Sequence, residues 1–174
     1  MTDLRCSESV VVASTPEAVY AMVADVTRMG EFSPTCAQCW WDEGAGPEPG
    51  SWFTGRNVTP ERTWETRSQV VTAEPGRAFG WVVGEGWVRW DYTFEPAPGG
   101  VRVTESWEFT AAGLARFRER FGDDADAQIA DRTAQARAGI PVTLAAIQRV
   151  AEQEPVITPR WTATSGPATA TGGS

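Results

Sequence analysis

Hydrophobic and polar residues alternate along most of the chain from residue 51 to residue 110, which predicts β-strands. A period of two places successive side chains on opposite faces of a sheet. Short connections rich in Gly, Pro and Glu separate the alternating segments, and such turns are typical of antiparallel hairpins. The predicted strands are 36–41, 51–58, 62–72, 78–83, 87–96 and 101–109. Together they predict a six-strand antiparallel meander.

A strand and two short helices are predicted before the meander. Residues 5–13, RCSESVVVA, predict the strand. Thr15 and Pro16 mark a helix start, because a hydroxyl can cap the first turn and proline fits an early helical position. We expect that helix to continue over 18–26 and a second short helix to end before Pro34.

The periodicity becomes helical after Thr110. The first apolar face comprises Leu114, Phe117 and Phe121. Beyond 122–124, apolar residues recur every three or four positions as far as Val150, which predicts a long amphipathic helix. Gly139 and Pro141 lie inside this helix, so we expect a kink or a local break there.

The order of these elements predicts one α+β domain. A curved antiparallel sheet, buried on one face by a single long helix, would enclose a space between the two. We expect the domain to span residues 1–157. Residues 158–174 are rich in Thr, Ala, Gly and Ser and predict a disordered tail.

The composition argues against several classes of function. The net charge of −8 argues against nucleic-acid binding, because no basic stripe could neutralise phosphates. The chain has no histidine, which removes the commonest general base and most catalytic zinc sites. Cys36 and Cys39 form an isolated CxxC, so we expect neither a metal nor another cofactor. No apolar run approaches the length of a membrane span and no signal peptide is recognisable, which predicts a cytoplasmic protein without membrane insertion.

Nine tryptophans favour a large apolar interior, a pocket lined by rings, or both. Several of them share the inward parity of their strands with small residues between them. The candidate ligand-binding residues are Phe53, Trp64, Trp81, Trp90 and Trp107. A solidly packed aromatic core is the alternative that this pattern leaves open.

One carboxylate stands in an apolar column. Glu105 shares the parity of Val103 and Trp107, where an unpaired charge costs several kcal/mol or is neutralised. It is either a cavity acid that orients a ligand or moves a proton, or half of an ion pair with an arginine such as Arg56. We favour the ion pair.

Two other polar residues share the inward parity. The hydroxyl of Tyr92 could donate to an enolate or carbonyl oxygen, or could simply be satisfied within the core. The amide of Asn57 could donate to a ligand carbonyl or satisfy a backbone turn. With Glu105, these residues are the candidate catalytic set.

The stretch TPEAVYAMVADVTRMGEFSP resembles the helical opening of the START-related SRPBCC proteins, in particular the polyketide cyclase/dehydrase-like branch. The stretches GSWFTGRN, RTWETRSQVVTAEPGRAFGWVV and WDYTFEPAPGGVRVTESWEF resemble later strands of that family. The resemblance covers residues 8 to 152 approximately. It implies a helix-grip fold, in which a curved antiparallel sheet wraps around a long C-terminal helix and leaves an apolar cavity.

The resemblance implies binding of a hydrophobic, polyketide- or lipid-like small molecule between the sheet and the helix. The alternative is a polyketide cyclase or dehydratase that works without a metal or a histidine base. A weaker alternative is a protein-interaction module of the chaperone-cofactor type. The family shares a site location rather than one catalytic constellation, and Phe32 stands where its members usually carry Trp before Ser-Pro. The sequence does not decide the oligomeric state.

Overall fold

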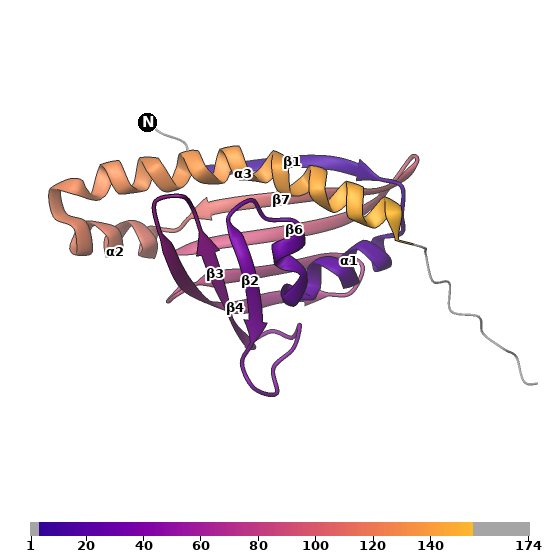
Figure 1. The fold of residues 1–174 in the computed structure, drawn as a ribbon, viewed down its shortest axis with the longest axis horizontal. Coiled ribbons are helices and arrows are strands. Elements are labelled where there is room, and N and C mark those ends of the chain that lie inside the picture. Colours follow the sequence, from indigo (N-terminus) through magenta and orange to yellow (C-terminus); the bar gives the residue numbers. More distant parts are fainter. Residues whose placement is uncertain (1–3, 155–174) are drawn as a thin grey trace, which may run out of the picture.

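Seven antiparallel strands form one curved sheet in the computed structural model, which describes residues 4–154 (Figure 1). The strands are β1 (Arg5–Val12), β2 (Cys36–Trp41), β3 (Trp52–Val58), β4 (Thr63–Glu74), β5 (Ala78–Val83), β6 (Val88–Ala97) and β7 (Gly100–Phe109). Their order in the sheet is β1-β7-β6-β5-β4-β3-β2. The predicted six-strand meander from β2 to β7 is confirmed, and β1 extends it by pairing with β7.

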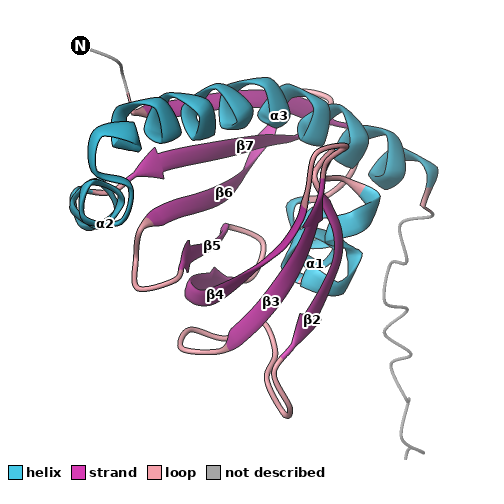
Figure 2. Cartoon of the chain, turned by 60° about the vertical axis from the view of Figure 1, so that its left-hand side comes forward, coloured by secondary structure: helices cyan, strands magenta, loops and turns pink. Residues whose placement is uncertain are grey.

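The helices lie on one side of the sheet. Between β1 and β2 lie α1 (Pro16–Ala24) and the 3-10 helix η1 (Val26–Glu31), and after β7 come α2 (Ala111–Phe121), η2 (Gly122–Asp124) and α3 (Ala125–Gln153). Figure 2 shows the sheet curving around α3, with α2 at one end and α1 at the other. The helix α3 packs against β1, β7, α1 and α2. The predicted α+β class and helix-grip fold are confirmed.

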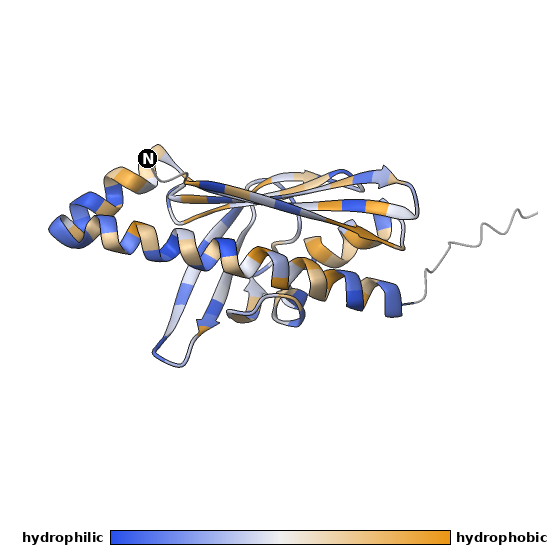
Figure 3. Ribbon diagram, turned by 90° about the horizontal axis from the view of Figure 1, so that it is seen from above, coloured by the Kyte–Doolittle hydropathy of each residue, from blue (hydrophilic) through white to orange (hydrophobic). Residues whose placement is uncertain are grey.

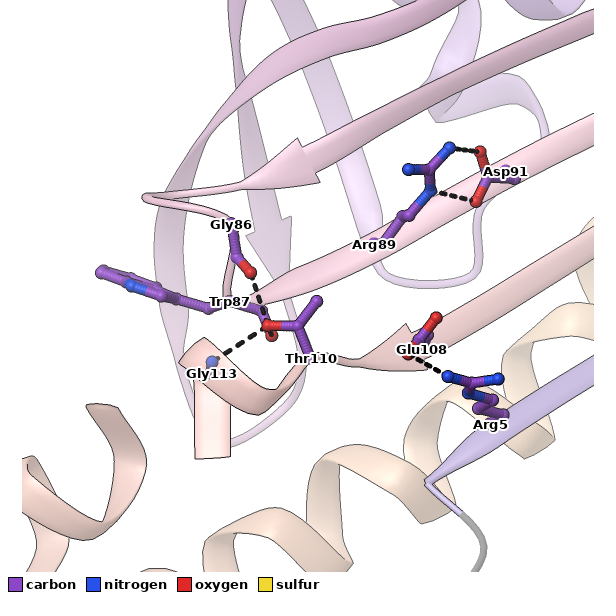
Figure 4. Close-up of polar contacts among 8 residues, drawn as sticks. All are labelled: Arg5, Gly86, Trp87, Arg89, Asp91, Glu108, Thr110 and Gly113. Atoms are coloured by element: carbon purple, nitrogen blue, oxygen red, sulfur yellow. Dashed lines mark hydrogen bonds and ion pairs between the residues drawn. The ribbon is translucent and has the colours of Figure 1, made fainter. Parts of the chain in front are cut away.

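The helices α1 and α2 each start at a threonine whose hydroxyl acts as the cap. The hydroxyl of Thr15 accepts from the backbone N–H of Ala18 at 3.2 Å, as the sequence predicted. At α2, the hydroxyl of Thr110 accepts from the backbone N–H of Gly113 at 3.0 Å and donates to the carbonyl oxygens of Gly86 and Trp87 (Figure 4). Thr110 therefore ties the start of α2 to the β5–β6 turn.

The long helix differs from the prediction at Gly139 and Pro141. It is 29 residues long and runs through both positions without the expected break. Pro141 lies on the exposed side of α3, where water can replace the backbone donor that proline lacks. The predicted tail over 158–174 and the domain boundary at 157 lie outside the described residues.

The C-terminal half of α3 packs against the hydrophobic core. In the C-terminal half, Ile140, Leu144 and Ile147 are buried in the main hydrophobic core. Near this end, Tyr20 of α1 makes edge-on contacts with Phe79 and Phe94 at ring distances of 6.4 and 5.8 Å. Figure 3 shows hydrophobic residues alternating with hydrophilic ones along the helix and the strands. The α1 end of the sheet is therefore filled by side chains.

The outward-facing residues of the sheet carry surface ion pairs. Arg89 pairs with Asp91 at 2.6 Å, and Arg5 pairs with Glu108 at 2.7 Å (Figure 4). These groups are substantially exposed, so each pair contributes little to stability. They show that the polar parity of β6 and β7 points away from the helices, as the alternation predicted.

Candidate functional site

A cavity of about 660 Å³ lies between the sheet and the helices α2 and α3. Its volume is within the range that is usual for small-molecule sites, about 300–1,000 Å³. All eight residues singled out from the sequence line it: Phe53, Asn57, Trp64, Trp81, Trp90, Tyr92, Glu105 and Trp107. Strand parity therefore identified part of the wall that the sheet contributes.

Three tryptophans on neighbouring strands form the centre of this wall. Trp81 of β5 is the cross-strand partner of Trp90 in β6, and Trp90 is the partner of Trp107 in β7. The rings of Trp81 and Trp90 stack with centroids 6.3 Å apart, and Trp107 meets Trp90 edge-on at 6.4 Å. Trp81 and Trp107 are buried, whereas Trp90 is half-buried. The rings form a rigid apolar surface beside the cavity and leave its volume open.

Glu105 and Tyr92 face each other on β7 and β6 and are 3% and 1% exposed. Burial raises the pKa of Glu105 to about 8, and hydrogen bonding from the Tyr92 phenol offsets only part of that rise. Within residues 4–154, the Oε2 atom of Glu105 has no hydrogen-bond partner. The carboxyl group is therefore mostly neutral at pH 7, and one of its oxygen atoms is buried without a hydrogen-bond partner in the wall of the cavity.

The favoured ion pair between Glu105 and Arg56 is wrong. Arg56 is exposed and donates to the carboxylate of Glu65 from Nη2 at 2.9 Å and from Nε at 3.1 Å. Arg56 and Asn57 are consecutive residues of β3, so their side chains point to opposite faces of the sheet. Asn57 is the one that lines the cavity. The arginine therefore lies on the other face of the sheet from Glu105.

Asn57 lines the cavity, but its amide protons are already used. Its Nδ2 donates to the carbonyl oxygen of Gly55 at 3.3 Å and to the hydroxyl of Thr66 at 3.2 Å. The bond to Thr66 joins β3 to β4, and the two bonds together favour the structural interpretation of this residue. Tyr92 differs, because burial and the neighbouring Glu105 raise its pKa well above the ordinary value and keep it a neutral donor.

Cys36 and Cys39 form part of the wall that the sequence did not predict. A spacing of three would place them on opposite faces of a regular strand, but the pairing of β2 with β3 shifts by one residue between Cys36 and Gln38. Both thiols are buried against the cavity, with their sulfur atoms 3.3 Å apart. A Cβ at Gly55 would lie 3.2–3.3 Å from both sulfurs, so this glycine makes room for the pair.

The helices contribute a polar part of the wall that was also missed. The residues of α3 that line the cavity are Gln128, Arg132, Gln135, Ala136, Gly139 and Thr143. They are polar or small, and they recur at helical spacing beside the apolar stripe of α3. This spacing is visible in the sequence and could have indicated a polar helix face. Arg62, in the β3–β4 turn, and Arg120, on α2, complete this part of the wall. The exposed residues Arg62, Arg120 and Gln135 lie here, so the cavity meets solvent at this end.

No cluster of three or more His, Cys, Asp or Glu side chains within residues 4–154 could hold a metal ion. Over the same residues, no helix is both long and apolar enough to cross a membrane.

Comparisons with known proteins agree with this fold. Residues 3–139 match the sequence model of the family described as polyketide cyclase/dehydrase and lipid transport. The solution NMR structure of the Polyketide_cyc-like protein Cgl2372 from Corynebacterium glutamicum is 53% identical, covers 87% of this chain and 93% of that chain, and has a TM-score of 0.64. No curated protein sequence matches.

More distant structures share the fold alone. The protein NE0264 from Nitrosomonas europaea is 14% identical, with 88% of this chain and 97% of that chain covered and a TM-score of 0.62. The di-domain ARO/CYC StfQ from the steffimycin biosynthetic pathway is 16% identical, with 86% of this chain and 50% of that chain covered and a TM-score of 0.61.

Proposed function

Because this chain belongs to the polyketide cyclase/dehydrase and lipid transport family, we propose that it binds one hydrophobic, polyketide- or lipid-like molecule between the sheet and α3. The observation that carries the proposal is the cavity of about 660 Å³ with its row of tryptophans. Aromatic side chains held by neighbouring strands lose little conformational freedom when a ligand packs on them. Each 100 Å² of apolar ligand surface removed from water would contribute about 2.5 kcal/mol before the costs of association.

Replacing Trp90 with Ala should weaken the binding of an apolar ligand more than it weakens the fold. Trp90 is half-buried in the middle of the row, so its loss removes contact surface from the cavity. We expect the Kd of the neutral probe N-phenyl-1-naphthylamine to rise about tenfold in a fluorescence titration. The control is Trp52→Ala on the opposite parity of β3, where the ring lies under the guanidinium of Arg67. Unchanged affinity in Trp90→Ala would contradict the pocket assignment.

A second candidate function is catalysis of cyclisation or dehydration on the bound molecule. It is favoured by the Oε2 atom of Glu105, which lacks a partner within the described residues. A neutral carboxyl group there could hydrogen-bond a ligand carbonyl and stabilise the negative charge that develops on its oxygen as an enolate forms. The nearby phenol of Tyr92 would support this group, and the cavity walls would hold the flexible chain in position.

Deuterium exchange distinguishes the two candidate functions. Benzoylacetone, a small aromatic β-diketone, exchanges its methylene protons through the enol. If Glu105 promotes enolisation, the wild type should speed this exchange in D₂O, as followed by proton NMR, at least about tenfold more than Glu105→Gln. The benzoylacetone Kd of the variant should change little, because the amide has nearly the same shape. Equal exchange rates with both proteins would leave binding as the function.

A further inference from the structure

Three arginines from three different elements lie at the solvent end of the cavity. Arg62 belongs to the β3–β4 turn, Arg120 to α2 and Arg132 to α3, and all three line the cavity. Arg62 and Arg120 are exposed, whereas Arg132 is half-buried. We call these three residues the arginine rim. They are far apart in the sequence, so only the fold gathers their charges.

The positive charge of the arginine rim is only partly balanced. Arg132 pairs with its neighbour Asp131 at 2.6 Å. Among the ion pairs of residues 4–154, none involves Arg62 or Arg120, and their guanidinium groups lie over aromatic rings, Arg62 at 4.2 Å from that of Trp64. Two acidic residues also line the cavity: Glu105, which burial keeps mostly neutral at pH 7, and Glu65, whose carboxylate accepts from Arg56. At least two positive charges therefore remain for an external anion.

Arg62 and Arg132 are also close enough to affect each other. Burial is the main cause that lowers the pKa of Arg132, and the charge of Arg62 lowers it further. Two like charges at the edge of an apolar cavity oppose each other unless an anion lies between them. Guanidinium groups are suited to that role, because their fixed N–H donors match the oxygens of a carboxylate, sulfonate or phosphate.

The chain as a whole has the opposite charge, with a net value of −8. A protein of this charge should on average repel an anionic ligand, so any preference for one must come from a local feature. The arginine rim is such a feature, and it lies at one end of a cavity whose inner wall is apolar. The cavity is therefore complementary to a molecule with a hydrophobic body and one negatively charged end.

We propose that the ligand is an amphipathic acid, with its apolar body against Trp81, Trp90 and Trp107 and its anionic group held at the solvent end by Arg62 and Arg132. This inference rests on the proposed binding function and specifies the class of ligand. Arg120 adds positive charge to the same end.

Two fluorescent probes with the same ring system test the inference. N-phenyl-1-naphthylamine is neutral, and 8-anilinonaphthalene-1-sulfonate has the same rings with one sulfonate. Their Kd values would be measured with wild type, Arg62→Gln, Arg132→Gln and the double variant. The matched control is Arg118→Gln, which removes the same charge from an exposed position of α2 that does not line the cavity. Displacement of the neutral probe by the sulfonate probe checks that both occupy one site.

We expect the wild type to bind the sulfonate probe about tenfold more tightly than the neutral probe at low salt. Each single variant should reduce that preference, and the double variant should abolish it while changing the Kd of the neutral probe less than about twofold. Raising the salt from about 20 mM to about 300 mM should weaken the binding of the sulfonate probe alone. Arg118→Gln should behave as wild type.

The outcomes separate this inference from the proposed function. If both probes bind the wild type equally, or if the preference survives in the double variant, the arginine rim does not recognise an anion and the inference is overturned. In that case the proposed binding of an apolar molecule would stand. If neither probe binds, the proposed function fails and the inference fails with it.

Discussion

The free energy of unfolding should become almost independent of pH between about pH 5 and pH 8 when Glu105 is replaced by Gln, whereas that of the wild type should fall. The carboxyl group has a pKa of about 8 in the fold and about 4.5 when unfolded. Between these values the folded state binds more protons than the unfolded state, so stability decreases as the pH rises. The penalty is absent below about pH 4.5, is complete above about pH 8, and is on the order of 5 kcal/mol.

Urea unfolding at about pH 5, 6, 7 and 8 would measure this difference. The chain has no histidine, so few other groups titrate in the window. The thiol of Cys36, whose pKa is lowered, is present in both proteins and cancels in the comparison. Glu95→Gln, an exposed carboxylate on β6, is the matched control and should follow the wild type. Parallel pH profiles for Glu105→Gln and wild type would mean that Glu105 is ionised in the fold.

Gly113→Ala should lower the free energy of unfolding by about 2–3 kcal/mol, which is large for the addition of one methyl group. A Cβ at this position would overlap the backbone carbonyl oxygen of Trp87 and would lie 2.9 Å from the ring of Phe109. The carbonyl belongs to the β5–β6 turn and also accepts from the Thr110 hydroxyl, so it cannot move without loosening the start of α2 (Figure 4). Thermal and urea unfolding would measure the change.

The same substitution at Gly139 provides the control. There a Cβ would meet only Pro34, at an ordinary contact distance of 3.8 Å. Gly139→Ala should therefore stabilise α3 by about 0.5–1 kcal/mol, because alanine loses less backbone entropy in a helix. The helix α2 also supplies Phe117 and Phe121 to the cavity, so Gly113→Ala should weaken the uptake of N-phenyl-1-naphthylamine. Equal effects on stability at the two glycines would refute the role assigned to the close contact.

The inward residues of the sheet could be predicted because strand parity is a local property. Trp81 and Trp90 face the cavity as their alternation indicated, and the acid Glu105 shares that face. The partner of Glu105 could not be predicted in the same way. Its neighbour Tyr92 follows from the register between β6 and β7, and Arg56 was excluded by the face of β3 on which it lies. A side chain's face depends on its own strand, whereas its partner depends on how strands pair.

Two parts of the site depended on irregular or long-range geometry. The shift in pairing between Cys36 and Gln38 brought two thiols to one face, and a regular alternation could not indicate it. The arginine rim depended on where α2 and α3 meet the β3–β4 turn. Helical periodicity gave the polar stripe of α3 but not the element that the stripe would face.

The sequence by itself determined the order of strands and helices, the curved sheet with its aromatic inner face, and the position of one acid on that face. These follow from hydrophobic periodicity and turn residues, which act over a few neighbouring positions. Only the tertiary structure decided that Glu105 has no cationic partner among the described residues, that the tryptophans border an open volume, and that three arginines lie at its solvent end. These features arise from contacts between segments distant in the chain, whose packing sets the burial and the charge around each group.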